Sequence, residues 1–269
     1  GNWDACSGYH YNDTTLKGFS HTHLSGTGCI DLGDILFRPT TLKPDLTTES
    51  IYQPAAFSHK DEDASAGYYS VVLKEEGIKA ELTVTAHAGM HRYTFPSGKE
   101  ASLIIDLTHL LDNEYIYEAE LEQTAANEIT GMRRTRGWTD NQYVYFVAQF
   151  SKPFQAIDFI QNKKMVSAGV KLNGTDLQAC LSFDNSNGEP VIAKVGLSIV
   201  SEKNARENLE TEVIGFDFDA VRSAARSAWE QALSAITVKG GNTDDLKNFY
   251  TAMYHSMVVP NVVSDVNGE

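Results

Sequence analysis

The sequence is poor in cationic residues and has no long apolar run, and each shortage excludes a class of protein. It carries 22 Lys and Arg against 36 Asp and Glu, which gives a formal net charge of −14. An acidic surface repels phosphate backbones, so we expect no nucleic-acid partner. No apolar stretch approaches the roughly 20 residues that cross a bilayer, so we predict no membrane span.

Cysteine is scarce as well, and several short catalytic motifs are missing. The three cysteines, Cys6, Cys29 and Cys180, include no C-x-x-C spacing, which excludes a zinc ribbon. Cys6–Cys29 is the disulfide to test first, with three buried thiols as the alternative. Walker A, G-x-S-x-G and H-E-x-x-H sequences are absent, and the glycine-rich run at 25–33 leads into a strand-like segment rather than a helix. A phosphate cradle is therefore not expected.

What the sequence does contain is period-two patterning from about residue 30 to residue 200. Runs such as KAELTVTA (79–86), NQYVYFVAQF (141–150) and VIAKVGLSIV (191–200) are rich in β-branched and aromatic residues. Turn signals such as Asn173-Gly174 separate the runs, and no helical segment lies between them. We predict a mainly β fold with a large antiparallel β-sandwich over residues 1–201.

The period changes near residue 202, and residues 202–269 are predicted to be helical. DFDAVRSAARSAWEQALSAI (217–236) is amphipathic, with Asp217 suited to its first turn. A second helix is predicted over 242–261, with Thr243 as its N-cap and Pro260 as its stop. We expect apolar faces of both helices to be exposed and to await a further helical domain, and a homodimer through such a face is an alternative.

A double histidine stands out in GFSHTHLSGTGCIDLGDILFRP (18–39). In a strand His21 and His23 would point to the same face and could bind one metal ion. No third ligand lies at a suitable spacing. A hydrogen-bonded structural role and recognition of a polar ligand remain the alternatives.

The first residues, NWDACSGYHY (2–11), combine aromatic rings with amide and carboxyl groups. Aromatic faces stack on the C–H faces of sugars while polar side chains bind hydroxyls. This segment, with Trp3, Tyr9, His10 and Tyr11, is therefore a candidate sugar-binding stretch. The alternative is an aromatic mini-core near the chain end.

Several runs carry a resemblance to a known family. NWDACSGYHYNDTTLKGFSHTHLSGTGCIDLGDILFRPTT (2–41), ITGMRRTRGW (129–138) and YHSMVVPNVVSDVNGE (254–269) closely resemble glycoside hydrolase family 92, the calcium-dependent exo-α-mannosidases. The resemblance implies an N-terminal supersandwich, a helical linker over 202–269 and an (α/α)6 barrel, of which this chain would hold only the beginning. It also implies a periplasmic or extracellular parent, with a lipid anchor as an option.

The resemblance further implies inverting hydrolysis of terminal α-mannosides by the parent, whose acid, base and Ca2+ ligands would lie in the barrel. We therefore assign no catalytic or metal-binding residue, and expect this fragment alone to be inactive. Trp3 first, then His21 and His23, are the implied substrate-binding residues. The expected partners are a mannose-containing glycan and the chain's own C-terminal catalytic domain. The alternatives are a stand-alone carbohydrate-binding module and a metal-dependent β-sandwich enzyme.

Overall fold

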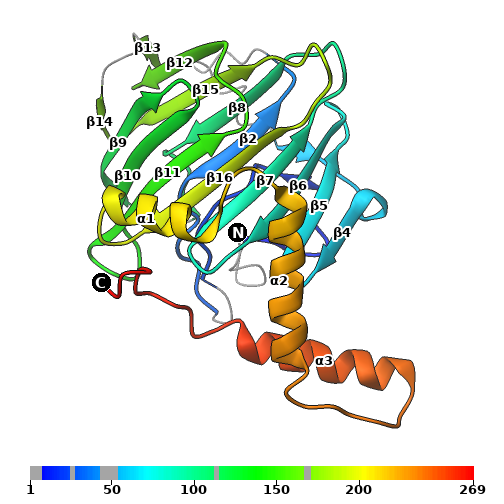
Figure 1. The fold of residues 1–269 in the computed structure, drawn as a ribbon. Helices are drawn as coiled ribbons and strands as arrows, with labels where there is room; N and C mark the ends of the chain where they lie inside the picture. The colour runs from blue at the N-terminus through cyan, green and yellow to red at the C-terminus, as the bar shows by residue number, and fades with distance from the viewer. Residues whose placement is uncertain (1–7, 25–27, 43–53, 112–114, 167–170) are drawn as a thin grey trace.

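The computed structural model describes residues 8–24, 28–42, 54–111, 115–166 and 171–269. Two antiparallel sheets face each other, and helices lie on the outer face of the larger sheet (Figure 1). The predicted antiparallel sandwich followed by helices is therefore confirmed. Trp3 and Cys6 lie outside the described residues, so the role of Trp3 and the Cys6–Cys29 disulfide stay predictions.

The larger sheet has nine strands in the order β14-β9-β10-β11-β16-β7-β6-β5-β4. All its neighbouring strands pair antiparallel. Its strands are β4 Glu62–Ser65, β5 Tyr68–Leu73, β6 Ile78–Val84, β7 Ala88–Thr94, β9 Tyr115–Ala125, β10 Glu128–Arg136, β11 Gln142–Phe150, β14 Leu172–Gly174 and β16 Val191–Ser198.

The smaller sheet has five strands in the order β13-β12-β15-β8-β2. These strands are β2 Leu36–Thr40, β8 Ala101–Asp106, β12 Ala156–Gln161, β13 Lys164–Val166 and β15 Leu177–Phe183. A two-stranded pair, β1 Thr15–Leu16 with β3 Ala55–Ala56, and a short 3-10 turn, η3 His59–Asp61, complete the β region.

The core lies between the two sheets because alternate side chains of each strand point to the same face. Fully buried aromatic rings dominate it, among them Phe37, Tyr93, Phe146, Phe150 and Phe159. A second apolar cluster lies on the other face of the larger sheet, where Met90 and Val147 meet residues of the helices. The central part of the larger sheet is thus buried on both faces.

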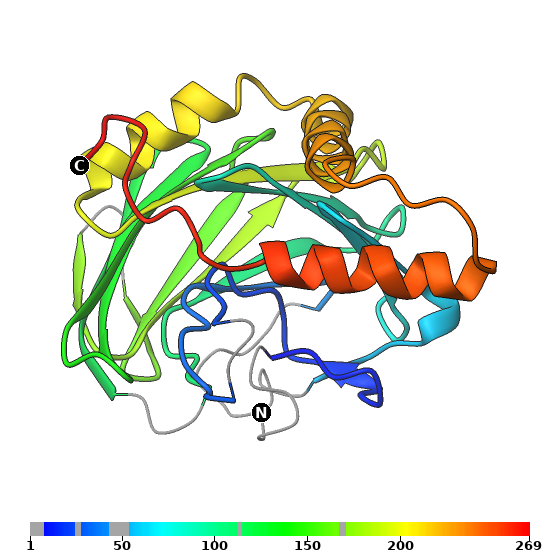
Figure 2. The same cartoon turned by 90° about the horizontal axis from the view of Figure 1, so that it is seen from below.

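Three helices follow the sandwich. Helix α1 (Glu202–Glu212) lies across β16 and β11, and α2 (Phe218–Leu233) lies across β5, β6 and β7 (Figures 1 and 2). Helix α3 (Thr243–Met257) contacts α2 and extends beyond the edge of the sandwich. The carboxylate of Asp217 caps α2 by accepting from the backbone N–H of Ala220.

One prediction about the helices was wrong. The N-cap of α3 is Asn242 rather than Thr243, because the Asn242 side chain accepts from two backbone N–H groups and Asp245 completes a capping box. Of the apolar stripe predicted over 217–236, Phe218 packs in the cluster with Met90 on the sheet, whereas Ile236 is 53% exposed. Further exposed apolar side chains lie at the end of α3 and after it, at Met257, Val259, Val262, Val263 and Val266.

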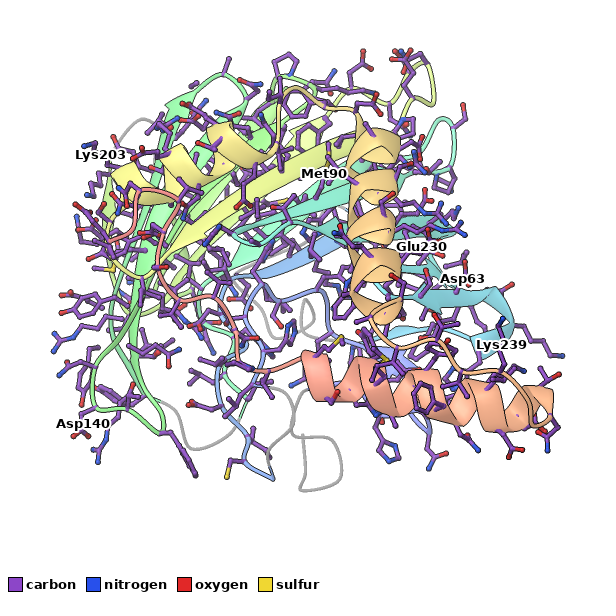
Figure 3. The ribbon with its side chains drawn as sticks, turned by 60° about the horizontal axis from the view of Figure 1, so that its bottom comes forward. Asp63, Met90, Asp140, Lys203, Glu230 and Lys239 are labelled. Atoms are coloured by element: carbon purple, nitrogen blue, oxygen red, sulfur yellow. The ribbon has the colours of Figure 1, made fainter. Side chains whose placement is uncertain are left out.

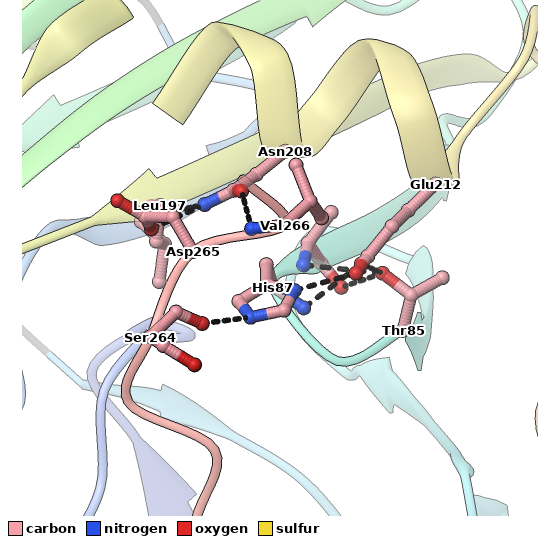
Figure 4. A network of polar contacts seen from close by, with 9 residues as sticks. Thr85, His87, Leu197, Asn208, Glu212, Ser264, Asp265 and Val266 are labelled. Atoms are coloured by element: carbon pink, nitrogen blue, oxygen red, sulfur yellow. Dashed lines mark hydrogen bonds and ion pairs between the residues drawn. The ribbon is translucent and has the colours of Figure 1, made fainter. Parts of the chain in front are cut away.

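The segment after α3 turns back to α1 and is held there by a buried carboxylate (Figure 4). Asp265 accepts hydrogen bonds from Ser198 Oγ at 2.7 Å, Asn204 Nδ2 at 2.8 Å and Asn208 Nδ2 at 2.7 Å. The backbone N–H of Val266 donates to Asn208 Oδ1 at 2.9 Å. Residues 264–269 are therefore fixed to the end of β16 and to α1, far from them in sequence.

His87, in the turn between β6 and β7, extends the same network. Its Nδ1 lies 2.5 Å from Glu212 Oε1, and its Nε2 donates to Ser264 O at 2.8 Å. Glu212 also accepts from the His87 backbone N–H and from Thr85 Oγ1. The imidazole thus joins the last turn of α1 to the returning segment, a contact we call the His87 latch (Figure 4).

Candidate functional site

The glycine-rich run, described at residues 18–24 and 28–35, forms an irregular antiparallel pair beside the edge of β2. Phe19 and Phe37 exchange backbone hydrogen bonds of 2.8 and 2.9 Å, and His23 bridges Leu32. Ile35 has φ 57° although it is β-branched and fully buried, a conformation that costs energy and persists only where packing enforces it. The surrounding core therefore determines the course of this run.

Gly33 is the position where only glycine fits. Its φ is 91°, and a Cβ there would lie 2.7 Å from Leu111 Cγ. A side chain would thus meet both an unfavourable backbone conformation and a side chain already in place. The glycine lets the run pass close to the loop that follows β8.

A buried ion pair anchors the run to β10. Arg133 Nε and Nη2 lie 2.8 and 2.7 Å from Asp34 Oδ1, and both side chains are fully buried. The other carboxylate oxygen, Oδ2, accepts from Thr22 Oγ1 at 2.7 Å and from Gln142 Nε2 at 3.0 Å. Arg133 also donates to backbone carbonyls, including that of His109. Removal of either partner of such a buried pair is costly, and the pair holds the run in one geometry.

His21 points into the sandwich and joins a chain of hydrogen bonds. Its Nδ1 donates to Ile35 O at 2.6 Å, which leaves Nε2 to accept from His91 Nε2 at 3.0 Å. The other nitrogen of His91 then accepts from the hydroxyl of Tyr93 at 2.8 Å. This chain requires both imidazole rings to be neutral, because a protonated ring would donate from both nitrogens and could not accept from its neighbour.

The electrostatics agree with this proton arrangement. Burial lowers the pKa of His21 to about 4, with the Ile35 carbonyl opposing the shift. Burial also lowers the pKa of His91 well below its usual range. Because both ring nitrogens of His21 are used inside the protein, the geometry favours the hydrogen-bonded structural role among the alternatives for this residue.

His23 lies on the exposed side of the run and has a different partner. Its Nε2 lies 2.9 Å from Ser20 Oγ, and the residue is exposed. The two imidazoles are therefore not aimed at one common atom. Among the residues with a described position, no group of three or more His, Cys, Asp or Glu is arranged to hold a metal ion.

The described part of the aromatic N-terminal stretch lies against η3. The Tyr11 ring stacks on His59 with centroids 4.3 Å apart, and Tyr11 is 68% exposed. Tyr9 donates to Glu62 at 3.3 Å, and burial together with that carboxylate raises the pKa of Tyr9 to about 12. These rings thus form an exposed aromatic surface rather than a closed mini-core.

Trp138 is an exposed aromatic residue that the sequence analysis missed as a site candidate. It lies in the β10–β11 hairpin, whose tip is marked by Asp140 in Figure 3, and is 73% exposed. Its backbone N–H approaches Asp31 Oδ2 at 3.4 Å, and a Cβ on Gly137 would lie 2.0 Å from Asp31 Oδ1. The hairpin therefore leans on the glycine-rich run. A tryptophan directly after a glycine, just before the strand-like run 141–150, was the available signal.

The arrangement is suited to binding rather than to proton transfer. The exposed indole of Trp138 and the exposed His23 lie beside a run that a buried ion pair holds, whereas Tyr9 and Tyr11 lie at η3 and β4, towards the other end of the larger sheet. Aromatic faces with nearby polar groups bind ligands that carry both C–H surfaces and hydroxyls. We call the surface beside the run, defined by His23 and Trp138, the aromatic edge.

Comparison with protein families agrees with this fold. The model of the glycosyl hydrolase family 92 N-terminal domain matches residues 1–198, and that of the family 92 catalytic domain matches residues 204–269. The first match covers most of the chain. The chain belongs to glycosyl hydrolase family 92.

Individual relatives show the same likeness. A family GH92 α-mannosidase of Bacteroides thetaiotaomicron is 37% identical with a TM-score of 0.91 over 98% of this chain and 37% of its own. A GH92 inverting mannosidase of that organism, at 23% identity and TM-score 0.82 over 97% of this chain and 35% of its own, shares the fold. An uncharacterized secreted glycosidase of Arthroderma benhamiae is 30% identical over 97% of this chain. The chain spans 37% of that relative's length.

Proposed function

We propose that this chain is the N-terminal part of an exo-acting α-mannosidase, which hydrolyses terminal α-mannosides of glycans with inversion. The observation that carries the proposal is the 37% identity and TM-score of 0.91 to a family GH92 α-mannosidase. A structure of that mannosidase in complex with mannoimidazole matches this chain with a TM-score of 0.92. The family places the parent among the glycoside hydrolases.

The proposed division of labour follows the two parts of the chain. Residues 1–201 would form a scaffold that lends its aromatic edge, with Trp3, His21 and His23, to one side of the sugar pocket. Residues 202–269 would lead into the catalytic domain, whose remainder is the expected partner of the exposed valines after α3. A homodimer through that apolar surface is the alternative use of the same residues.

Inverting hydrolysis needs two carboxyl groups roughly 6.5–9.5 Å apart, with room for a water between them. We propose that the rest of the parent supplies both. We propose the same source for the ligands of Ca2+, which prefers six to eight oxygen atoms. The described residues of this chain offer no metal-binding cluster, so none is assigned here and no step is derived through the ion.

The aromatic edge would act by positioning. The indole face of Trp138 can bind the C–H face of a sugar, and His23 adds a polar group near it. The ion pair Asp34–Arg133 and the neutral His21 hold the run in place from below. Positioning of this kind lowers the entropic cost of reaching the transition state.

We also propose a periplasmic or extracellular parent, with lipid anchoring as a variant. The support is the secreted character stated for the Arthroderma benhamiae glycosidase. None of the helices within the described residues has the length and apolarity that crossing a bilayer requires.

The test compares this chain with the full-length parent on α-mannoside substrates, with and without a calcium chelator. We expect turnover only by the parent, lost with the chelator and accompanied by release of the β-anomer, which NMR detects directly. Turnover by the 269-residue chain alone, or retention of the α-anomer by the parent, would contradict the proposal.

A matched pair of variants tests the role of the aromatic edge. Trp3→Ala in the parent should lower kcat/KM about tenfold, because one stacking surface of the pocket is lost. Met165→Ala, at an exposed position on the edge strand β13, is the control and should leave kcat/KM unchanged. Equal rates for wild type and Trp3→Ala would remove Trp3 from the site.

A further inference from the structure

A cavity of about 280 Å³ lies on the five-stranded sheet, on the face turned away from the sandwich core. Leu36 and Gln178 both pair with Asp106 across β2, β8 and β15, so the three side chains stand in one row. Their neighbours Phe37 and Ile105 belong to the core between the sheets, which fixes this row on the opposite face. The cavity is near the lower end of the size range of small-molecule sites, about 300–1,000 Å³.

Asp106 makes the cavity unusual. It is 4% exposed, and its Oδ1 accepts from Thr108 N at 2.8 Å, Thr108 Oγ1 at 2.7 Å and Gln178 Nε2 at 3.1 Å. Within the described residues, none donates a hydrogen bond to the second oxygen, Oδ2. This oxygen is not one of the fully buried polar atoms without a partner, so solvent reaches it and a ligand hydroxyl or N–H can replace the water that it binds.

The other polar groups around the cavity define the charge of that ligand. Lys17, which is exposed, and Arg38 are cationic, whereas burial lowers the pKa of His109 to about 4, so His109 is neutral. A cationic ligand would face Lys17 and Arg38, and an anionic one would face Asp106. A neutral ligand with several hydroxyls can donate to Asp106 and accept from the cations at the same time.

The apolar side chains that line the cavity restrict the chemical class of the ligand further. Leu36, Ile104 and Leu110 supply aliphatic surface between the polar groups. Hydroxyls that alternate with C–H faces on one small ring match such a mixed lining. We propose that this cavity is a binding site for a neutral sugar ring, with Asp106 Oδ2 accepting from its hydroxyl groups. The site does not depend on the proposed hydrolytic function.

The test is titration of the chain with methyl α-mannoside, followed by calorimetry and by amide chemical-shift changes. We expect saturable binding with shifts confined to residues around 104–110 and 178. Asp106→Asn retains an oxygen for Thr108 and Gln178 and replaces the free acceptor with an NH2 group. This substitution should weaken binding about tenfold or more, since one charge-assisted hydrogen bond is lost.

Two further variants keep the result interpretable. Asp158→Asn, on the neighbouring strand β12 and outside the cavity lining, is the matched control and should bind like wild type. Circular dichroism checks whether Asp106→Asn folds. Lys17→Ala changes only an exposed side chain, so it should fold normally and weaken sugar binding about threefold, and it tests the site even if Asp106→Asn does not fold.

The proposal is overturned if methyl α-mannoside causes no saturable shifts around the cavity, which would leave the cavity to water. It is equally overturned if Asp106→Asn and Lys17→Ala, both folded, bind like wild type, or if glycine binds there and the sugar does not. Hydrolysis by the parent reports separately on the proposed function, and Asp106→Asn should leave that rate unchanged. Failure of the binding test at the cavity therefore does not imply that the proposed hydrolytic function is wrong, and the reverse also holds.

Discussion

The sandwich and the helices that follow it are stabilised in different ways. The sheets enclose a large core with fully buried aromatic rings such as Phe146 and Phe150. Helix α2 buries only Phe218, and α3 buries only Met253. Side chains after α3, such as Val262 at 63% and Val263 at 64%, are largely exposed. The sandwich carries its own stability, whereas α2 and α3 are held by few contacts and should open separately.

The largest loss of stability is expected from a substitution in the sandwich. Arg133→Ala leaves the Asp34 carboxylate buried without its cation, and should lower the free energy of unfolding by about 3–5 kcal/mol. Arg134→Ala, the next residue on β10, removes contacts with Asn141 and Tyr117 near the surface and should cost less than about 1 kcal/mol. Urea denaturation measures both, and similar losses would show that the ion pair is not the anchor.

The next largest effect is expected where the segment 264–269 attaches to the end of β16 and to α1. Asp265→Ala removes the acceptor of three hydrogen bonds and leaves Asn204 and Asn208 short of partners. We expect a local loss of about 1–3 kcal/mol, seen as faster hydrogen exchange at 264–269 and in α1. Val263→Ala, just before the segment and 64% exposed, is the control and should not change exchange. Unchanged protection in Asp265→Ala would show that the network does not hold the segment.

The His87 latch should make this boundary sensitive to pH. Burial lowers the pKa of His87, but the hydrogen bond and charge of Glu212, the Ser264 carbonyl and the charge of Asp265 outweigh it, so the pKa is raised above 6.5. For Glu212, hydrogen bonds from Thr85 and His87 outweigh burial, and its pKa is lowered below 4.5.

The direction of the pH dependence follows from the protonation state of each side chain that the folded protein favours. The stabilisation from His87 is complete below 6.5 and is lost as pH rises through the raised pKa, whereas that from Glu212 is present above 4.5 and is lost in acid. Exchange protection at 264–269, corrected for intrinsic rates, should therefore fall as the pH rises above about 6.5. His87→Gln should abolish this dependence. A slope that survives the substitution would assign the titration to another group.

The smallest effect is expected in the helices. Trp229 of α2 lies 4.7 Å from Tyr254 of α3, ring centre to ring centre. Trp229→Ala should change the free energy of global unfolding by less than about 1 kcal/mol, because α2 and α3 can open without the sandwich. Phe146→Ala, an aromatic truncation within the core, should cost about 3–5 kcal/mol. Comparable values from urea denaturation would show that helices and sandwich unfold as one unit.

The sequence was sufficient for the fold class because period-two patterning and helical periodicity are local signals. It placed the α3 N-cap one residue late because Asn242 and Thr243 are both good N-cap residues, and only the geometry selects between them. It also did not show that α2 would cover the outer face of the larger sheet, since that contact depends on tertiary packing.

The site was predictable only in part. His21 and His23 were visible as a pair, but His91, the partner of His21, lies 70 residues away and on a strand whose position in the sheet no local pattern reveals. Asp34 and Arg133 are 99 residues apart. Arg133 was hidden as well because β10 is buried along most of its length, so an arginine there breaks the usual correspondence between charge and exposure.

Strand β7 has one further consequence. His91 faces the sandwich and contacts His21, while the adjacent Arg92 faces outward and binds Asp219 of α2 at 2.9 Å. The helical layer and the glycine-rich run are therefore separated by the thickness of a single polypeptide backbone.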